Sequence, residues 1–364
     1  MARNDGAPAG NPTGLVHVLV ARFSAIGDVA MTVPVLYSVC RCYPDVTFTL
    51  VTRPSMTAIF VNAPRNLDVR GVDLKDQYRG PAGMRRLVRE IHRERPVDVF
   101  IDLHDVIRTR LMGLWCRLQG IPVARINKGR ARRRALTRRH NKVMLPLTSQ
   151  RALYRETFFR AGLPVAEHFN GLFDGRGKAD PALFAPVTPP KQSGDIWIGV
   201  APFAAHSGKI YPPEKMFEVV KALVENPAVR IFLLGGGNSE QQVLESWAAA
   251  LPRVTSLAGK RYGFGRELAL FNHLDLMLTM DSANMHLASI AGTPTVSVWG
   301  ATHPYCGFKG WRQSDNDTVQ LPLTCRPCSV FGDKPCHRGD YLCLQAIKPE
   351  VIIKKVLERL DNNS

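Results

Sequence analysis

Short apolar runs recur along the chain in two series, and helix-like patterns separate the runs. In the first half the expected strands are residues 16–21, 46–51, 97–103 and 121–126, and the expected helices are 28–40, 84–95 and 106–118. In the second half the expected strands are 196–200, 229–234, 274–279 and 295–299, and the expected helices are 213–223, 239–251, 282–291 and 349–360. Such alternation predicts parallel sheets covered by helices on both faces.

The two series predict two doubly wound, Rossmann-like α/β domains that face a central cleft. Residues 174–195 are rich in Pro, Gly and Asp and lack periodicity, which is typical of a linker. The expected division is a polar tail (1–14), an N-terminal Rossmann-like domain (15–180), a linker (181–195), a C-terminal Rossmann-like domain (196–345) and a C-terminal helix (346–364) able to pack back on the N-terminal domain. The tail has no apolar segment typical of a secretory signal, and no apolar run approaches the roughly 18 residues that span a bilayer.

Positive charge is concentrated in one stretch of the 364-residue chain. The chain has 48 Lys and Arg against 31 Asp and Glu, a net charge of +17, and nine of these cations and no acid lie in residues 125–142, here called the basic segment. Such a segment either meets an anionic partner or remains solvated. It lacks the interleaved aromatic residues that stack on bases, which counts against nucleic acid, and it also lacks an apolar face for deep insertion into a membrane. An apolar fraction of 45% excludes disorder as the main state.

Two loops that follow expected strands carry candidate catalytic groups. Asp28 follows the strand 16–21 and a small-residue loop; it is either a helix N-cap or a general base facing the cleft. Gly208 and Lys209 follow the strand 196–200, where backbone N–H groups and an ammonium can both reach an anion. The alternative for Lys209 is an ordinary surface lysine.

A third loop predicts a diphosphate site. Asp281 ends a strand, and Ser282 and Asn284 open a helix whose unpaired N–H groups and dipole favour an anion. The alternative is a capped helix with His286 turned into the core.

Together these segments resemble glycosyltransferase family 9, the ADP-heptose:lipopolysaccharide heptosyltransferases. The resemblance rests on R-F-S-A-I-G-D-V (22–29), G-K-I-Y-P (208–212), D-S-A-N-M-H-L-A (281–288) and G-T-P-T-V-S-V-W-G-A-T (292–302), in the order and spacing of the family and over nearly the whole chain. It implies a GT-B fold and a metal-independent, inverting transfer of heptose from ADP-heptose to a lipopolysaccharide core acceptor. The N-terminal domain (15–180) would bind the acceptor, and the C-terminal domain (196–345) would bind the nucleotide sugar.

The resemblance also implies residue roles. Asp28 would be the general base on the acceptor hydroxyl, and Lys209 would neutralise the diphosphate. The donor-binding residues would be Lys209, Asp281, Ser282, Ala283, Asn284, Met285, His286, Gly300 and Thr302. The acceptor-binding residues would be Ser24, Gly27, Arg130, Arg132, Arg133 and Arg134. The implied partners are a nucleotide-sugar donor, an anionic lipid A–inner core glycolipid and the inner face of the cytoplasmic membrane, without nucleic acid and with no required cofactor; the implied location is cytoplasmic.

Several positions depart from the family pattern and leave the donor open. Ala204 and Ala205 replace hydroxyl residues before the lysine motif, Ala283 replaces a glycine, and Tyr211 replaces a tryptophan. The acidic residue expected after the strand 229–234 is shifted to Glu240, with Asn238 before it. Transfer of another nucleotide-linked sugar is therefore the first alternative, and a basic nucleic-acid-binding protein the second. An NAD-dependent oxidoreductase is disfavoured because the first loop lacks GxGxxG.

Four cysteines near the C-terminus form the pattern C-x2-C-x7-C-x6-C. They are Cys325, Cys328, Cys336 and Cys343. Four close thiols are compatible with a structural zinc site, with His337 as a substitute ligand, while disulfides and unlinked thiols remain alternatives.

Overall fold

The structure is a computed structural model that describes residues 14–174 and 177–362. Contacts divide the chain into two compact units. In the described part, the first unit holds residues 14–128 and 151–169, and the second holds 129–150 and 170–362. Most of the predicted tail lies outside the described residues.

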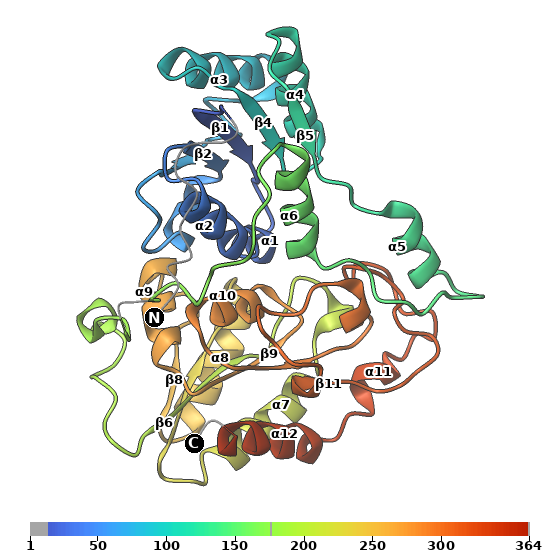
Figure 1. Cartoon of the computed structure of the whole chain (residues 1–364). Coiled ribbons are helices and arrows are strands. Elements are labelled where there is room, and N and C mark those ends of the chain that lie inside the picture. Colours follow the sequence, from blue (N-terminus) through green and yellow to red (C-terminus); the bar gives the residue numbers. More distant parts are fainter. Residues whose placement is uncertain (1–13, 175–176, 363–364) are drawn as a thin grey trace, which may run out of the picture. The chain divides into compact units, whose positions relative to one another are not determined.

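Five parallel strands form the sheet of the first unit in the order β3-β2-β1-β4-β5 (Figure 1). They are β1 (His17–Ala21), β2 (Thr47–Thr52), β3 (Leu67–Gly71), β4 (Val99–Asp102) and β5 (Val123–Arg125). Strand β1 is central, since Ala21 pairs with Val51 of β2 and with Asp102 of β4. All residues of β1 are buried, which explains the continuous apolar run in the sequence.

Helices cover both faces of this sheet (Figure 1). On one face lie α3 (Gly80–Glu94) and α4 (Ile107–Leu118), which bury residues such as Leu87, Ile91 and Met112 in one cluster with β1 and β4. The other face carries α1 (Ile26–Ala30), α2 (Thr32–Cys42) and α6 (Gln150–Arg160). A 3-10 turn, η1 (Pro54–Ile59), follows β2.

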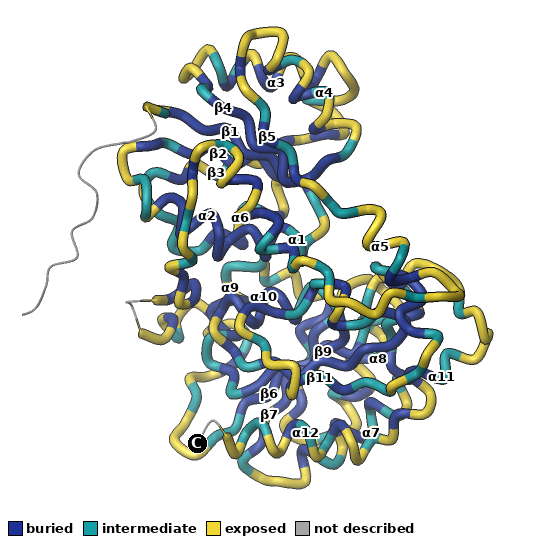
Figure 2. The backbone as a smooth tube through the Cα atoms, turned by 45° about the vertical axis from the view of Figure 1, so that its right-hand side comes forward, coloured by how far each residue is buried: buried dark blue, intermediate teal, exposed yellow. Residues whose placement is uncertain are grey.

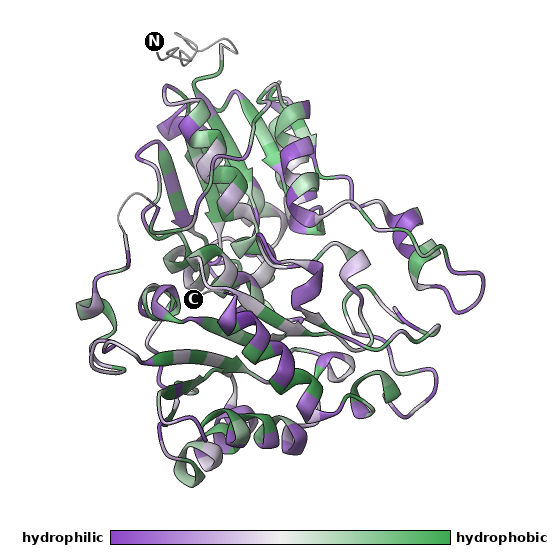
Figure 3. Ribbon diagram, turned by 60° about the horizontal axis from the view of Figure 1, so that its bottom comes forward, coloured by the Kyte–Doolittle hydropathy of each residue, from purple (hydrophilic) through white to green (hydrophobic). Residues whose placement is uncertain are grey.

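Six parallel strands form the sheet of the second unit in the order β11-β10-β9-β6-β7-β8. They are β6 (Ile196–Ala201), β7 (Val229–Leu233), β8 (Val254–Ser256), β9 (Leu276–Met280), β10 (Thr295–Val298) and β11 (Thr318–Val319). The helices are α5 (Arg130–Thr137), α7 (Pro213–Leu223), α8 (Asn238–Ala250), α9 (Phe264–His273), α10 (Ala283–Ala291), α11 (Leu342–Gln345) and α12 (Pro349–Asp361). Short 3-10 turns are η2 (Pro181–Phe184), η3 (Ser207–Lys209), η4 (Pro304–Cys306) and η5 (Asp315–Asp317). In both units the strands are largely buried and hydrophobic (Figures 2 and 3).

The C-terminal helix packs within the second unit, contrary to the expectation that it returns to the N-terminal domain. Helix α12 contacts α7 and the strands β9, β10 and β11. Ile352 and Val356 lie one turn apart on its buried face and join the core of the second sheet. This apolar face is already covered inside its own unit.

The expected linker is part of the second unit. Residues 181–184 form η2, whose Phe184 is buried with its ring centroid 6.0 Å from Trp197 and 4.9 Å from His273. The second unit therefore begins near residue 170, before the expected linker.

The basic segment does not lie wholly in the N-terminal domain, as was expected. Residues 129–142 of the basic segment group with the second unit, and only residues 125–128 group with the first.

Three strands and several helices were not predicted. Strands β8 and β11 have only 3 and 2 residues, too few for a periodic pattern. The third, β3, reads Leu-Asp-Val-Arg-Gly and is mostly exposed or half-buried. The unpredicted α5 has the sequence Arg-Ala-Arg-Arg-Arg-Ala-Leu-Thr, with little apolar surface to reveal a helix. Within the described residues, no helix is long and apolar enough to cross a membrane.

Candidate functional site

In the first unit, the candidate base Asp28 lies in the first turn of α1, directly after the β1 loop. Its Oδ2 is 2.5 Å from Nη2 of Arg22, and the two side chains are 20% and 6% exposed. Asp28 Oδ2 also accepts a longer bond, 3.4 Å, from the backbone N–H of Ala25. The carboxylate thus has part of the predicted capping role, but its main partner is a buried guanidinium and it keeps an exposed edge.

Arg22 and Asp28 are held by a shared set of contacts. Arg22 Nη1 donates to the carbonyl of Leu103 at 2.8 Å, and its guanidinium lies 5.9 Å from the ring centroid of Tyr154. The Tyr154 hydroxyl donates to the Asp28 carbonyl at 3.1 Å. Helix α6 thereby fixes both ends of the ion pair. In the same loop Gly27 is buried and Ser24 is half-buried.

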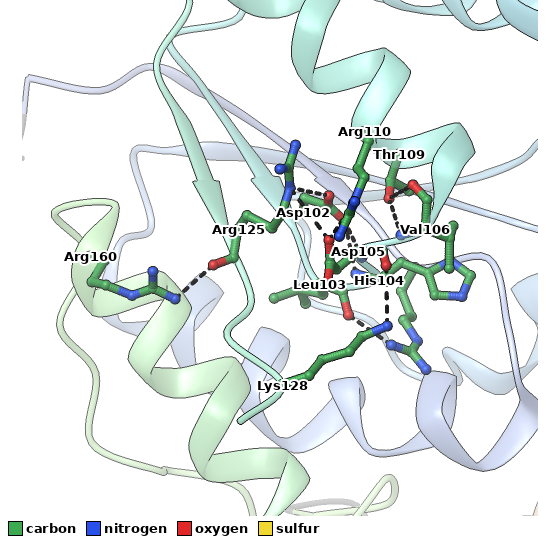
Figure 4. A network of polar contacts seen from close by, with 11 residues as sticks. Asp102, Leu103, His104, Asp105, Val106, Thr109, Arg110, Arg125, Lys128 and Arg160 are labelled. Carbon is green, nitrogen blue, oxygen red and sulfur yellow. Dashed lines mark hydrogen bonds and ion pairs between the residues drawn. The ribbon is translucent and has the colours of Figure 1, made fainter. Parts of the chain in front are cut away.

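A polar network at the carboxyl end of β4 was missed by the sequence reading (Figure 4). Asp102 is fully buried; its Oδ1 accepts the backbone N–H groups of His104 and Asp105, and its Oδ2 lies 3.0 Å from Nε of Arg125. Asp105 pairs with Arg110 at 2.8 Å. The sequence pattern that could have predicted this network is the polar pair His104 and Asp105 after the apolar run 97–103. Asp28 and Asp281 were singled out because they also come soon after apolar runs.

In the second unit, three strand ends bring together three of the predicted donor residues. Lys209 lies in η3 after β6, Asp281 follows β9, and Thr302 comes after β10. Lys209 Nζ is 3.1 Å from Asp281 Oδ2, and the Thr302 hydroxyl donates to the same oxygen at 2.8 Å. Asp281 is 4% exposed. Parallel strands end at one edge, so residues distant in sequence converge there.

The N-terminus of α10 adjoins this trio, since its N-cap Ser282 follows Asp281 directly. The first N–H groups of a helix have no intrahelical partner and carry its positive partial charge. Asn284 is half-buried, whereas Met285 and His286 are buried. Met285 is 0% exposed, so only its backbone can contribute to a donor.

Two glycines let the loops after β6 and β10 approach closely. A Cβ on Gly208 would lie 2.9 Å from Cβ of Ala301, and a Cβ on Gly300 would lie 2.5 Å from the Gly208 carbonyl. The N–H of Ala301 donates to that carbonyl at 2.7 Å. Gly300 therefore sets the distance between the loop of Lys209 and residues 300–302 after β10, here called the rim.

Arg326 supports that rim from inside the cysteine-rich segment. Its buried guanidinium donates to the carbonyls of Gly300 and Thr302, the latter at 2.8 Å, and to Leu321 at 2.5 Å. The N–H of Cys328 donates to the Ala301 carbonyl at 2.8 Å. Three consecutive rim carbonyls are thus bonded to this segment.

The cysteines themselves do not form the zinc site considered above. Within residues 14–174 and 177–362, no group of three or more His, Cys, Asp or Glu side chains is arranged to hold a metal ion. All eight cysteines are unbridged, and burial raises the pKa of Cys343 to about 11. The segment therefore acts here through Arg326 and its backbone.

Two departures from the family pattern have structural explanations. Tyr211 is fully buried, and its hydroxyl donates to the carbonyl of Ile347 at 2.9 Å, so the residue ties the loop before α7 to the C-terminal segment. Glu240 accepts the N–H of Gly236 at 2.6 Å in the glycine loop after β7. Its half-buried carboxylate therefore lies beside this exposed glycine loop.

The basic segment presents most of its cations to solvent. Arg130, Arg132 and Arg134 are exposed on α5. Arg133 is half-buried: its guanidinium lies 5.8 and 5.7 Å from the ring centroids of Phe308 and Phe331. Lys142 donates to the carbonyls of Cys325 and Pro327. Arg133 and Lys142 therefore anchor the segment to the second unit.

Exposed apolar side chains follow these cations directly. Val143, Met144 and Leu145 are 41%, 42% and 66% exposed. The absence of an apolar face was predicted for residues 125–142 alone, and these three side chains lie just beyond the last of them.

Comparisons with known proteins agree with this architecture. A family model described as glycosyltransferase family 9 (heptosyltransferase) matches residues 84–336. Lipooligosaccharide heptosyltransferase 2 of Campylobacter jejuni is 30% identical over 82 residues, 22% of this chain and 25% of that protein. The matches to three curated heptosyltransferases span 25% to 47% of their lengths.

Solved structures share the fold. A glycosyltransferase family 9 protein from Veillonella parvula superposes with a TM-score of 0.71 at 17% identity, over 95% of this chain and 98% of that one. The E. coli heptosyltransferase WaaC with ADP superposes with a TM-score of 0.64 at 16% identity, over 94% and 100%.

Two units, each with a parallel sheet between helical layers, give the protein the GT-B-like fold of these solved structures. The family model covers more than half of the chain, and the chain belongs to glycosyltransferase family 9, the heptosyltransferases. The predicted fold class and the resemblance are thereby confirmed.

Proposed function

We propose that the protein is an inverting heptosyltransferase that moves heptose from ADP-heptose to a lipopolysaccharide core acceptor. Family membership supports the sugar, and the relative WaaC, solved with ADP, supports the nucleotide. The observation that carries the proposal is the convergence of Lys209, Asp281 and Thr302 beside the N-terminus of α10. A cation, a helix N-terminus and a sugar-binding carboxylate together suit a sugar diphosphate.

The reaction follows from the chemistry of these groups. The acceptor hydroxyl attacks the anomeric carbon of the donor as the bond from that carbon to the diphosphate oxygen breaks, and configuration inverts. Asp28 takes the hydroxyl proton, because its exposed carboxylate edge can accept a hydrogen bond. Lys209 and the α10 N–H groups stabilise the charge that develops on the departing ADP. No step uses a metal.

The acceptor side uses the first unit and the basic segment. Ser24 and Gly27 lie beside Asp28 and contact the acceptor in this proposal. Arg130, Arg132 and Arg134 attract an anionic glycolipid, at about 1 kcal/mol per cation near a charged lipid surface, while Arg133 holds α5 in place. The exposed side chains of residues 143–145 enter the lipid headgroup region in this proposal, and the location we propose is the inner face of the cytoplasmic membrane.

Two measurements test the proposed function. A panel of nucleotide sugars is screened for protection against thermal unfolding, and we expect ADP-heptose to protect most strongly. Asp28→Ala should lower transfer by at least about a thousandfold and leave that protection intact, since the base acts only on the acceptor proton. Stronger protection by another nucleotide sugar would identify that sugar as the donor. Transfer at the wild-type rate by Asp28→Ala would show that Asp28 is not the general base.

A further inference from the structure

Helix α4 carries a row of apolar side chains on its outer side, here called the α4 seam. Ile107, Leu114 and Leu118 are 79%, 47% and 67% exposed, and Leu111 between them is half-buried. The steps between these residues are four, three and four positions, which places all of them on one narrow side of the helix. The opposite side of α4 is already buried in the core of the first unit, so the seam is not what holds the helix in place.

This spacing is the one found in helices that pair as coiled coils. In a heptad lettered a to g, the a and d residues form the contact between two helices, and the e and g residues flank it. Ile107 and Leu114 occupy d positions, and Leu111 and Leu118 occupy a positions. A single partner helix lying along α4 would therefore cover the whole seam.

Arginines flank the seam on both sides. Arg108 occupies an e position, Arg110 and Arg117 occupy g positions, and α4 contains no Asp or Glu. Arg110 is bound to Asp105, whereas Arg108 and Arg117 are exposed and form no ion pair with any residue of the described ranges. The charges beside the seam therefore favour acidic residues on whatever covers it.

Helix α3 extends this positive charge. The two helices contact each other on one face of the first sheet (Figure 1). Trp115 occupies the other e position of α4, and the guanidinium of Arg85 on α3 lies 5.1 Å from its ring centroid. Arg85 and Arg89, one turn further along α3, are both exposed. A helix seated on α4 would thus meet cations on both flanks.

We propose that the α4 seam docks an amphipathic helix of a partner protein, with apolar residues at its a and d positions and Asp or Glu at its e and g positions. A second copy of the chain fits poorly, because an isologous contact would set Arg108 and Arg117 against the arginines of the other copy. A lipid surface also fits less well, because helices that lie in a bilayer interface present a broad apolar face rather than a narrow seam. The inference is independent of the proposed transfer reaction.

Two synthetic peptides with opposite flanks test the seam. One consists of three heptads of Glu-Ile-Ala-Ala-Leu-Glu-Lys, which places Glu at the e and g positions beside an apolar seam of Ile and Leu; in the other, Glu and Lys are exchanged. Each peptide carries a fluorophore, and fluorescence anisotropy at low salt gives its Kd for the full chain. We expect the Glu-flanked peptide to bind at least about tenfold more tightly than the Lys-flanked peptide.

A reversal of charge tests the flanks. The double variant Arg108→Glu/Arg117→Glu should prefer the Lys-flanked peptide, since the attractive and repulsive pairs exchange places. The matched control is Arg65→Glu/Lys75→Glu, which makes the same change of charge at two exposed positions before and after β3, at the other edge of the sheet. This control should keep the wild-type preference.

Two serine substitutions test the apolar row. Leu114→Ser/Leu118→Ser should weaken binding of the Glu-flanked peptide at least about tenfold and leave the melting temperature unchanged, because both side chains are already exposed. Phe159→Ser removes a similarly exposed apolar side chain, 64% exposed on α6, and should bind the peptide like the wild type.

Equal affinity of the wild type for the two peptides, or a preference that survives Arg108→Glu/Arg117→Glu, would overturn the inference. Two further measurements test the other occupants. A concentration-dependent dimer in sedimentation velocity that Leu114→Ser/Leu118→Ser abolishes would overturn the inference in favour of a second copy. Sedimentation with anionic vesicles that the same variant abolishes would overturn it in favour of lipid. Failure of transfer from ADP-heptose would change none of these outcomes.

Discussion

Lys209 and Asp281 form an ion pair, with Nζ 3.1 Å from Oδ2, although they belong to loops that follow different strands. Thr302 donates to the same carboxylate oxygen, so Asp281 keeps one hydrogen bond when the lysine is engaged elsewhere. The lysine can therefore turn toward a diphosphate without leaving a buried carboxylate unpaired.

Replacing Lys209 should affect the donor far more than the fold. We expect Lys209→Gln to weaken ADP-heptose binding about tenfold and to lower kcat a further hundredfold, because the charge acts most strongly on the departing diphosphate. Lys221→Gln, an exposed lysine on α7, is the matched control. Titration calorimetry and steady-state kinetics measure both effects. Wild-type kcat in the Lys209 variant would contradict the assignment.

Arg22 should matter for stability as well as for activity. Arg22→Met leaves Asp28 without its guanidinium and the Leu103 carbonyl without its donor, and breaking such a pair costs roughly 3 kcal/mol. Tyr154→Phe removes only one hydroxyl bond, to the Asp28 carbonyl, and should cost about 1 kcal/mol. Urea unfolding at pH 7 compares the two. Equal costs would show that the ion pair contributes little.

Arg326 should behave as a structural residue of the second unit. Its guanidinium satisfies the carbonyls of Gly300, Thr302 and Leu321, so Arg326→Met leaves buried acceptors unpaired and should lower the free energy of unfolding by about 3 kcal/mol or more. Arg338→Gln removes an exposed cation from the same segment and should change it by less than about 0.5 kcal/mol. Thermal unfolding followed by calorimetry separates the two variants. Similar melting temperatures would contradict the supporting role.

The sequence allowed the main strands and the three candidate loops to be predicted for one reason. Buried strands of parallel sheets are continuous apolar runs, and Asp28, Lys209 and Asp281 come soon after such runs. The pairing of Lys209 with Asp281 needed the strand order, because their strands are neighbours in the sheet but not in the chain.

Other features depend on tertiary contacts that have no local signal. The stacking of Arg133 on Phe308 and Phe331 assigns α5 to the second unit, yet basic composition says nothing about which aromatic rings it will meet. Phe184 stands in a stretch with the composition of a linker, but Trp197 and His273 bury it. His104 was overlooked although its position after an apolar run was visible, because its ring contacts the backbone N–H of Phe23, which lies in the loop after another strand.

The basic segment should bind anionic membranes. We expect the full chain to sediment with vesicles of phosphatidylglycerol and phosphatidylethanolamine at low salt and to be released as salt rises. The triple variant Arg130→Gln/Arg132→Gln/Arg134→Gln should lose most of this binding, and Met144→Ser/Leu145→Ser should weaken it while preserving the salt dependence. The matched control is a triple Arg→Gln variant at Arg89, Arg93 and Arg117, which makes the same change of charge on α3 and α4, outside the basic segment. Equal loss in both triple variants would mean that net charge alone drives binding.

A buried histidine, His104, and a half-buried one, His303, should make the protein sensitive to mild acid. Burial, followed by nearby positive charges, lowers the pKa of His104 to about 3, and burial followed by Arg326 lowers the pKa of His303 to about 4. The unfolded chain has ordinary histidines near 6.5, so between these values and 6.5 the unfolded state binds more protons. The free energy of unfolding therefore rises with pH in that window: the contribution is fully present above about pH 6.5 and is lost progressively below it, at up to about 1.4 kcal/mol per pH unit for each histidine. Urea unfolding at pH 7.5, 6.5, 5.5 and 5.0 measures the slope, which should become shallower in His104→Gln and stay unchanged in His140→Gln, where the ring is exposed. An identical slope in His104→Gln and the wild type would mean that the pKa of His104 is not lowered in the folded protein.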